Sequence, residues 1–243
     1  MWKQALVPSV RDGGVWKAAN PCYVRDAGVW KRFHGQAIAY QASSMARSSS
    51  TLTTYTFTAR PFGPAAADRK IIAVIYWEQA SSVRDLVSAT IGGVAATLHV
   101  SRTRVGACSA IISADVPTGT SGTIAFTLDG GCNSAGVAGV YAVTGLANAA
   151  PHHTASTGGT GASSASVTLN LPGGGFAIMG GMSASNASAP HDWSFVTENE
   201  EGSETRHTAS SGHNPETVLT TGQSIGVSWS GSRIYSFVAL SWA

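Results

Sequence analysis

Apolar and polar residues alternate with a period of two along much of the chain, which indicates β-strands. In residues 52–58, Tyr55 and Phe57 are separated by threonine, as in a half-buried strand. Residues 70–77 are instead a continuous apolar run rich in β-branched and aromatic side chains. Such a run predicts a central strand that is covered on both faces. Further short strands are predicted at 87–91, 94–100, 107–114, 123–128, 137–143, 166–171, 176–182, 193–196, 205–209, 217–220, 224–230 and 234–242.

This spacing of short strands predicts an all-β fold. Turn sequences with glycine or proline separate the strands, and no window shows sustained helical periodicity. We therefore expect residues 52–243 to form a two-sheet antiparallel sandwich of the jelly-roll type. The last run, 234–242, should pass through the middle of one sheet. Residues 147–165 are poor in apolar side chains and are expected to be a long surface connection.

The N-terminal residues contain an internal repeat. The dipeptide Trp-Lys begins at Trp2, Trp16 and Trp30, so each copy starts fourteen residues after the last. The second and third copies, which include Lys17 and Lys31, each follow a Val-Arg-Asp-x-Gly-Val segment. We expect each of these segments to be a small β-hairpin.

The shared turn residues are Asp12 with Gly14 in one copy and Asp26 with Gly28 in the next. Asp-x-Gly is typical of a type I turn followed by a left-handed glycine. Hairpins of this size bury too little apolar surface to be stable alone. We therefore expect residues 1–36 to be an anchoring module that docks on another protein, with residues 37–51 as a Ser-rich linker. The alternative is that the hairpins lie at the edge of a single domain.

These repeats, together with four segments of the body, resemble those of a known family. The body segments are 88–98, 114–122, 141–146 and 172–178. The chain resembles virion appendage proteins of tailed bacteriophages and of phage-like gene transfer agents, such as tail fibres and head spikes. The resemblance implies a virion location, partners in the capsid, tail or baseplate, a homo-oligomer such as a trimer, and attachment to a host surface.

Charge and composition limit the partners further. Charged residues make up 12% of the chain and the formal net charge is +2, without any basic run. Nucleic-acid binding is therefore not expected, since it requires concentrated Lys and Arg. The sequence contains neither a signal-peptide pattern nor an apolar run of membrane-spanning length. We therefore expect that the protein does not associate with a membrane and that it is assembled in the cytoplasm of a bacterial host.

The cysteines and histidines give no metal-binding pattern. Cys22, Cys108 and Cys132 are expected to be free thiols, although a bridge between Cys108 and Cys132 is an open alternative. Five histidines are interpreted as ordinary polar loop residues: His152, His153, His191, His207 and His213. We expect neither a metal nor a cofactor.

One set of residues suggests carbohydrate binding. Asp192, Trp193, Glu198 and Tyr235 are candidate glycan-binding residues, because aromatic rings stack on sugar C–H groups and carboxylates accept hydrogen bonds from hydroxyls. Acidic residues are concentrated around Asp192 and Glu198. A solvated turn at 199–202 would explain this concentration more simply than a binding site does.

We expect no catalytic residues. Residues 222–226 match the G-x-S-x-G motif, but the following residues alternate as a strand does and no helix follows. The sequence therefore favours a non-enzymatic appendage protein that anchors through its N-terminus and binds a cell-surface polysaccharide. The alternatives are a decoration or spacer protein without a ligand, and an enzyme that degrades polysaccharide through Asp192 and the nearby glutamates.

Overall fold

The computed structural model describes residues 9–12, 15–18, 22–26, 29–34, 36–79, 81–185, 189–203 and 206–243, and for residues 9–34 it describes the backbone alone. These residues form twenty β-strands and no helix. The strands are β1 (Ser9–Asp12), β2 (Val15–Ala18), β3 (Cys22–Asp26), β4 (Val29–His34), β5 (Ala37–Tyr40), β6 (Ala46–Ser48), β7 (Leu52–Pro61), β8 (Lys70–Glu78), β9 (Leu86–Ile91), β10 (Val94–Ala95), β11 (Thr97–Arg102), β12 (Cys108–Asp115), β13 (Ser121–Cys132), β14 (Ser134–Thr144), β15 (His153–Leu171), β16 (Gly175–Ala184), β17 (Asp192–Ser194), β18 (Thr197–Ser203), β19 (His207–Thr217) and β20 (Thr220–Trp242).

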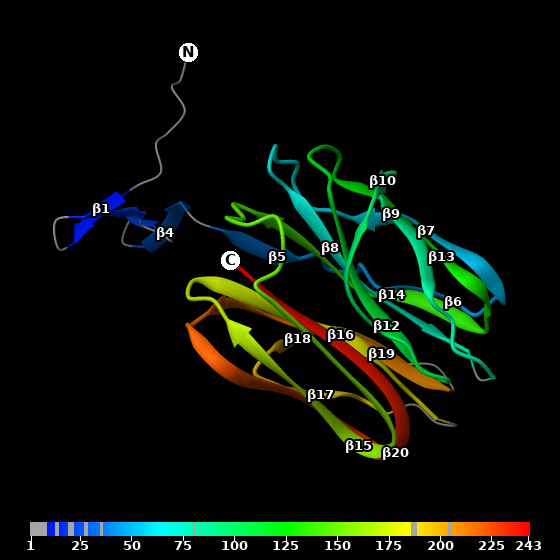
Figure 1. Ribbon diagram of the computed structural model, residues 1–243. Coiled ribbons are helices and arrows are strands. Elements are labelled where there is room, and N and C mark those ends of the chain that lie inside the picture. Colours follow the sequence, from blue (N-terminus) through cyan, green and yellow to red (C-terminus); the bar gives the residue numbers. More distant parts are fainter. Residues whose placement is uncertain are drawn as a thin grey trace.

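Three antiparallel sheets form the body of the molecule (Figure 1). The outer sheet has the order β10-β9-β13-β7, and the middle sheet has the order β11-β12-β8-β14-β5 with β6 also paired to β14. The C-terminal sheet has the order β15-β20-β16-β19-β18, with β17 paired to β20. The predicted all-β antiparallel class is confirmed. The body has one sheet more than the two that the sequence predicted.

The middle sheet is apolar on both faces because it lies between the other two. On β8, Ile75 and Trp77 belong to the hydrophobic cluster shared with the outer sheet. The alternate residues, Val74 and Tyr76, belong to the cluster shared with the C-terminal sheet. This is the physical reason for the continuous apolar run at 70–77, and it confirms the predicted central strand.

The C-terminal sheet folds over onto itself. Residues 153–159 of β15 pair with 235–241 of β20, and after a register shift residues 164–171 pair with 220–228. The shift lies near Gly161 and Gly231, whose φ of +77° is a left-handed conformation that glycine adopts readily. The folded half covers a third apolar cluster, in which Leu169 and Ile225 pack with Phe237. β20 runs between β15 and β16, as predicted for the last strand.

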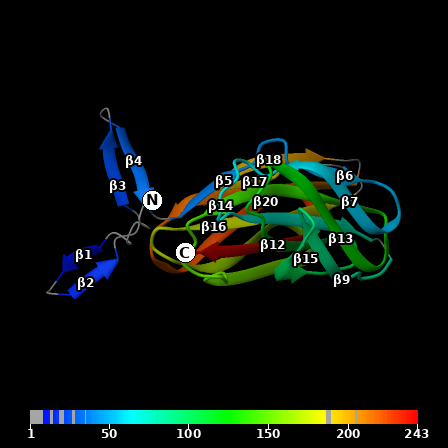
Figure 2. The same cartoon turned by 90° about the horizontal axis from the view of Figure 1, so that it is seen from above.

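The two N-terminal hairpins are present as separate two-stranded sheets, β1-β2 and β3-β4. Figure 2 shows both outside the stack of sheets. Asp12 pairs with Val15 and Asp26 pairs with Val29. This register corresponds to a two-residue loop, and it differs from the longer loop that a type I turn with a following glycine would make. The loop residues, Gly14 and Gly28 among them, lie outside the described residues, as does Trp2.

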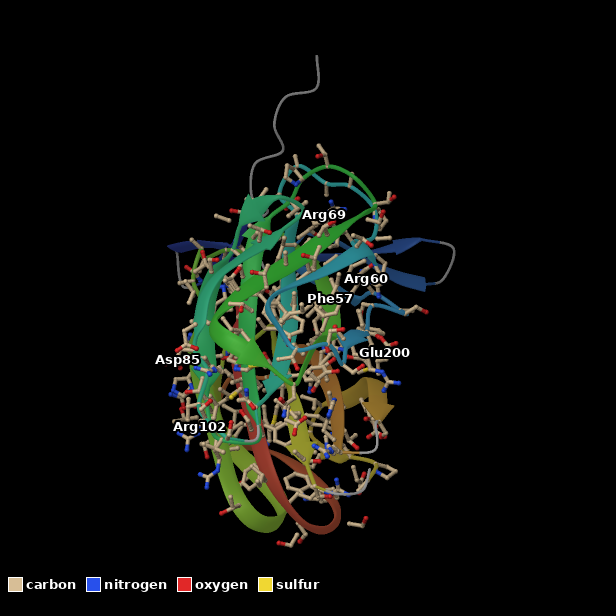
Figure 3. The ribbon with its side chains drawn as sticks, turned by 90° about the vertical axis from the view of Figure 1, so that its right-hand side faces the viewer. Phe57, Arg60, Arg69, Asp85, Arg102 and Glu200 are labelled. Carbon is tan, nitrogen blue, oxygen red and sulfur yellow. The ribbon has the colours of Figure 1, made fainter. Side chains whose placement is uncertain are left out.

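The predicted linker at 37–51 is wrong, because this segment contributes β5 and β6 to the middle sheet. The hydroxyl of Tyr40 donates to the Glu200 carboxylate, which also accepts from Met45 N at 3.0 Å. Arg60 Nη1 donates to the Met45 carbonyl at 2.9 Å. Figure 3 shows Arg60 and Glu200 on the same side of the molecule. Polar side chains from two other sheets thus hold a segment that has little apolar surface of its own.

Two predicted loops are also strands. The expected surface connection at 147–165 contains the first half of β15, and the expected turn at 199–202 lies within β18. Both strands are made mainly of small or polar residues, so their partners, β20 and β19, decide their conformation. Cys108 and Cys132 are buried free thiols in the structure. No helix in the described residues is long and apolar enough to cross a membrane.

Candidate functional site

A surface groove of about 490 Å³ lies where the folded half of the C-terminal sheet meets β17. This volume falls within the range usual for small-molecule sites. Three strands, β15, β17 and β20, supply its walls. The groove is lined by Thr157, Ser164, Ala165, Ser166, Asp192, Trp193, Ser194, Gly226, Val227, Ser228 and Tyr235.

Strand register places polar side chains in rows across this groove. Ser228 of β20 pairs with Ser164 on one side and with Asp192 on the other. All three side chains are exposed. A second row joins Ser166 to Ser194 across β20 in the same way. The groove therefore presents hydroxyl groups and one carboxylate at spacings fixed by the sheet.

Two half-buried aromatic residues also line the groove. The Trp193 ring packs edge-on against Phe237 at 5.7 Å between centroids, and its Nε1 donates to Ser210 Oγ at 3.2 Å. Tyr235 lies directly over Gly159, where a Cβ atom would come within 2.6 Å of the Tyr235 hydroxyl oxygen. Any larger residue at 159 would displace the ring, so Gly159 leaves the space that Tyr235 occupies.

A pair of carboxyl groups adjoins the Trp193 wall. Glu198 and Glu201 lie on β18 and their side chains share a hydrogen bond. Glu198 is exposed as a residue, yet loss of water around its carboxyl group raises its pKa to about 7, and the charge of Glu201 adds to the rise. Burial likewise raises the pKa of Glu201, which accepts a hydrogen bond from His191 N at 2.5 Å. This pair connects β18 to the chain just before β17.

His191 lies just before β17, in the loop position expected from the sequence, but it is buried beneath the groove. Its Nε2 is 2.8 Å from Ser183 Oγ and its Nδ1 is 2.5 Å from Ser210 Oγ. Burial lowers the pKa of His191 to about 3, with a further contribution from the charge of Arg233. The imidazole is therefore neutral at physiological pH and acts as a hydrogen-bonding core residue. His207 is buried too, against Tyr76 with ring centroids 5.5 Å apart.

The structure brings together three of the four candidate glycan-binding residues. Asp192, Trp193 and Tyr235 line the groove, and Glu198 lies behind it, where its carboxyl group hydrogen-bonds to Trp193. The candidate anchoring residues form a separate group in the hairpins. Trp16 and Lys17 lie in β2, and Trp30 and Lys31 lie in β4, with their backbone described.

The hydroxyl groups of the groove were not predicted from the sequence. Ser164 and Thr157 were placed in a surface connection, and Ser228 was treated as an ordinary strand residue. The alternation of small polar and apolar residues from Ser164 to Leu169 was a usable signal for one exposed face. The placement of Ser164 and Ser166 across β20 from Asp192 and Ser194 could not be predicted from this alternation, since it depends on how β20 folds.

The described residues contain no group of three or more His, Cys, Asp or Glu side chains placed to hold a metal ion. The Asp192 carboxylate, the hydroxyls and the aromatic rings of the groove offer hydrogen bonds and stacking. The arrangement is therefore suited to non-covalent binding of a hydroxyl-rich ligand.

Comparisons with known proteins identify no family for the chain. No family model matches it, and no curated protein matches it. Among solved structures, it is similar to a turret protein of Sulfolobus turreted icosahedral virus, with 16% identity over 85% of this chain and 99% of that chain. The TM-score is 0.19. A score of this size does not establish a shared fold, so nothing is transferred from the turret protein.

Proposed function

We propose that this chain is an appendage protein of a phage or phage-like particle, a tail fibre or head spike that binds cell-surface carbohydrate. The N-terminal hairpin repeats anchor it to a capsid, tail or baseplate protein, and the body presents the groove to the host. The protein acts as a homo-oligomer such as a trimer, so several weak sites engage the surface together.

The observation that carries this proposal is the composition of the groove. Trp193 and Tyr235 offer aromatic surface to the C–H groups of a pyranose ring, and Asp192 accepts hydrogen bonds from its hydroxyls. Serine hydroxyls on the neighbouring strands act as both donors and acceptors. An elongated saccharide matches this combination better than a compact apolar molecule does, because most of the lining side chains are polar.

The positions of the groove and of the N-terminal segment support the division of roles. Gln36, the first described residue of the body, donates through Nε2 to the Trp242 carbonyl, so the anchoring module joins the body where β20 ends. Figure 1 shows the bend of β15 and β20 at the other end of the body. Groove-lining residues on both sides of this bend, such as Thr157 and Ser164 of β15, place the groove beside it. At ~3.3 Å per residue, the stretch from Arg233 to Trp242 spans ~30 Å. An anchored module would thus leave the groove facing outward.

The anchoring role is tested with the double variant Trp16→Ala, Trp30→Ala. We expect a folded body, by circular dichroism and thermal unfolding, that no longer joins purified particles. Val218→Ala is the control for loss of an exposed apolar side chain elsewhere and should be incorporated normally. Normal incorporation of the double variant would disprove the anchoring role.

The binding role is tested with Tyr235→Ala, which removes one aromatic surface of the groove. Wild-type protein should bind purified host-surface polysaccharide, and the variant should bind at least about five-fold more weakly, since one stacked ring contributes on the order of 1 kcal/mol or more. Leu98→Ala, an exposed residue of β11, is the matched control. Equal binding by Tyr235→Ala would contradict the proposed site.

One observation favours a second candidate, a polysaccharide-degrading enzyme. Glu198, whose pKa is raised, and the nearby Asp192 form the kind of carboxyl pair that glycoside hydrolysis uses. We rank it second because Glu198 does not line the groove. Incubation of the same polysaccharide with the protein distinguishes the two, because an enzyme would release reducing ends and a binding protein would not.

A further inference from the structure

We infer that the groove selects uncharged glycans and discriminates against glycans that carry carboxylate, sulfate or phosphate groups. This inference rests on the proposed function and names the ligand class of the same site.

The groove is negatively charged. Asp192 is the one charged residue among its described lining residues, and Lys, Arg and His are absent from that lining. Anionic sugars are usually held by Arg or Lys, which can form charge-assisted hydrogen bonds with carboxylate, sulfate or phosphate oxygens. This groove offers an anionic sugar only hydroxyl groups and the negative charge of Asp192.

The carboxyl pair behind the Trp193 wall, Glu198 and Glu201, adds to the negative charge near the groove. The charges of Glu201 and Asp192 are both close enough to Glu198 to raise the pKa of its carboxyl group. Arg102 and Arg104 donate to the Gly158 carbonyl and the Thr160 hydroxyl on β15 and do not line the groove. Arg233 influences His191 from within the protein. Arg233 is 5% exposed and its Nε donates to the Ser230 carbonyl at 3.3 Å. It therefore belongs to the interior and does not line the groove.

Asp192 is the residue that determines this selectivity. It is exposed, and it pairs through its backbone with Ser228 in the row of hydroxyls that crosses the groove. An uncharged pyranose satisfies its carboxylate by donating hydroxyl hydrogen bonds. An anionic sugar at the same place would bring two negative charges together with no cation between them, which costs affinity.

The test is binding of the full chain to an array of oligosaccharides that includes uncharged, uronate, sialate, sulfated and phosphorylated members. We expect the strongest signals from uncharged members. A matched pair of polymers, dextran and carboxymethyl-dextran, supplements the array. Where dextran binds, its carboxymethyl form should bind at least about ten-fold more weakly at low ionic strength.

The variant Asp192→Asn keeps an acceptor oxygen and removes the charge. We expect it to weaken binding of uncharged glycans and to lower the ratio of uncharged to anionic affinity by about ten-fold. Asp115→Asn, a remote exposed carboxylate paired with Lys70, should leave this ratio unchanged. Strongest binding by anionic glycans would overturn the inference and leave the proposed function standing. Absence of binding across the whole array would overturn both.

Discussion

The core between the outer and middle sheets and the core inside the C-terminal sheet are built differently. In the first, β8 and β13 bury aliphatic and aromatic side chains such as Ile75, Trp77 and Phe126. The second contains Phe237 and Trp229 but surrounds a buried imidazole, His191, whose ring nitrogens lie within hydrogen-bonding distance of two serine hydroxyls. The first core holds sheets together, and the second also holds a groove wall in position.

This difference explains where a binding site can lie. The first core defines side-chain positions mainly by close packing, and the polar atoms of its aromatic residues bond to backbone carbonyls, as Trp77 Nε1 does to the Arg84 carbonyl at 2.9 Å. In the C-terminal sheet, hydrogen bonds run from Ser183 through His191 to Ser210, which also accepts from Trp193 at the groove. Buried polar networks that are fully satisfied restrict the native state to one arrangement. We therefore expect these hydrogen bonds to hold the Trp193 side of the groove in one arrangement.

The largest effect is expected in the apolar core. Trp77→Ala should lower the free energy of unfolding by about 3–5 kcal/mol, because Trp77 is fully buried and the variant leaves a cavity. Urea unfolding followed by circular dichroism measures the loss. Val87→Ala on the exposed side of β9 is the control and should change the free energy of unfolding by less than about 0.5 kcal/mol. A similar loss in both variants would show that this core does not stabilise the body as described.

A smaller loss of stability with a larger loss of binding is expected from His191→Ala. Removing the imidazole leaves Ser183 and Ser210 without this partner and opens space beside Phe237, at a cost of about 2–4 kcal/mol. Glycan binding should fall in protein that is still folded, because Trp193 loses support. His152→Ala, an exposed histidine, should affect neither property. Unchanged binding in His191→Ala would separate the interior network from the groove.

The smallest effect is the pH dependence of the Glu198 contribution. Its pKa is raised in the folded protein to about 7 from an ordinary 4.5, so the folded state holds the proton more tightly than the unfolded state. The contribution of Glu198 to stability therefore declines as pH rises from 4.5 to 7. His191 opposes this trend, because its lowered pKa makes the folded state less stable as pH falls below 6.5.

The variant Glu198→Gln isolates the Glu198 contribution from that of His191. Glutamine imitates the uncharged carboxyl, so the melting temperature of the variant relative to wild type should be higher at pH 8 than at pH 5. Differential scanning calorimetry at both pH values provides the comparison. A difference in melting temperature that does not change with pH would contradict the shifted pKa.

Sequence pattern was sufficient where one element carries its own signal. The central strand at 70–77, the last strand at 234–242 and the two hairpins followed from local apolar pattern or repetition. The pairing of Asp192 and Trp193 with β20 did not, because it depends on a fold-back of the sheet near Gly161 and Gly231.

The errors have a common cause. Segments rich in Ser, Thr, Gly and Ala, such as the first half of β15, become strands through long-range pairing that has no local apolar signal. The segment at 37–51 was misread for a related reason, since its place in the middle sheet depends on Glu200 and Arg60 from distant parts of the chain. The candidate residues Asp192, Trp193 and Tyr235 were chosen by chemistry alone, and the structure brings them to one groove.

Backbone hydrogen exchange of the full chain, with and without the strongest-binding oligosaccharide of the array, tests the central claim most directly. Our account predicts slower exchange on binding at β17 and at residues 226–228 of β20, with no change in β7 and β13 of the outer sheet. Protection confined to the outer sheet or to the N-terminal hairpins would contradict the claim that this groove is the binding site.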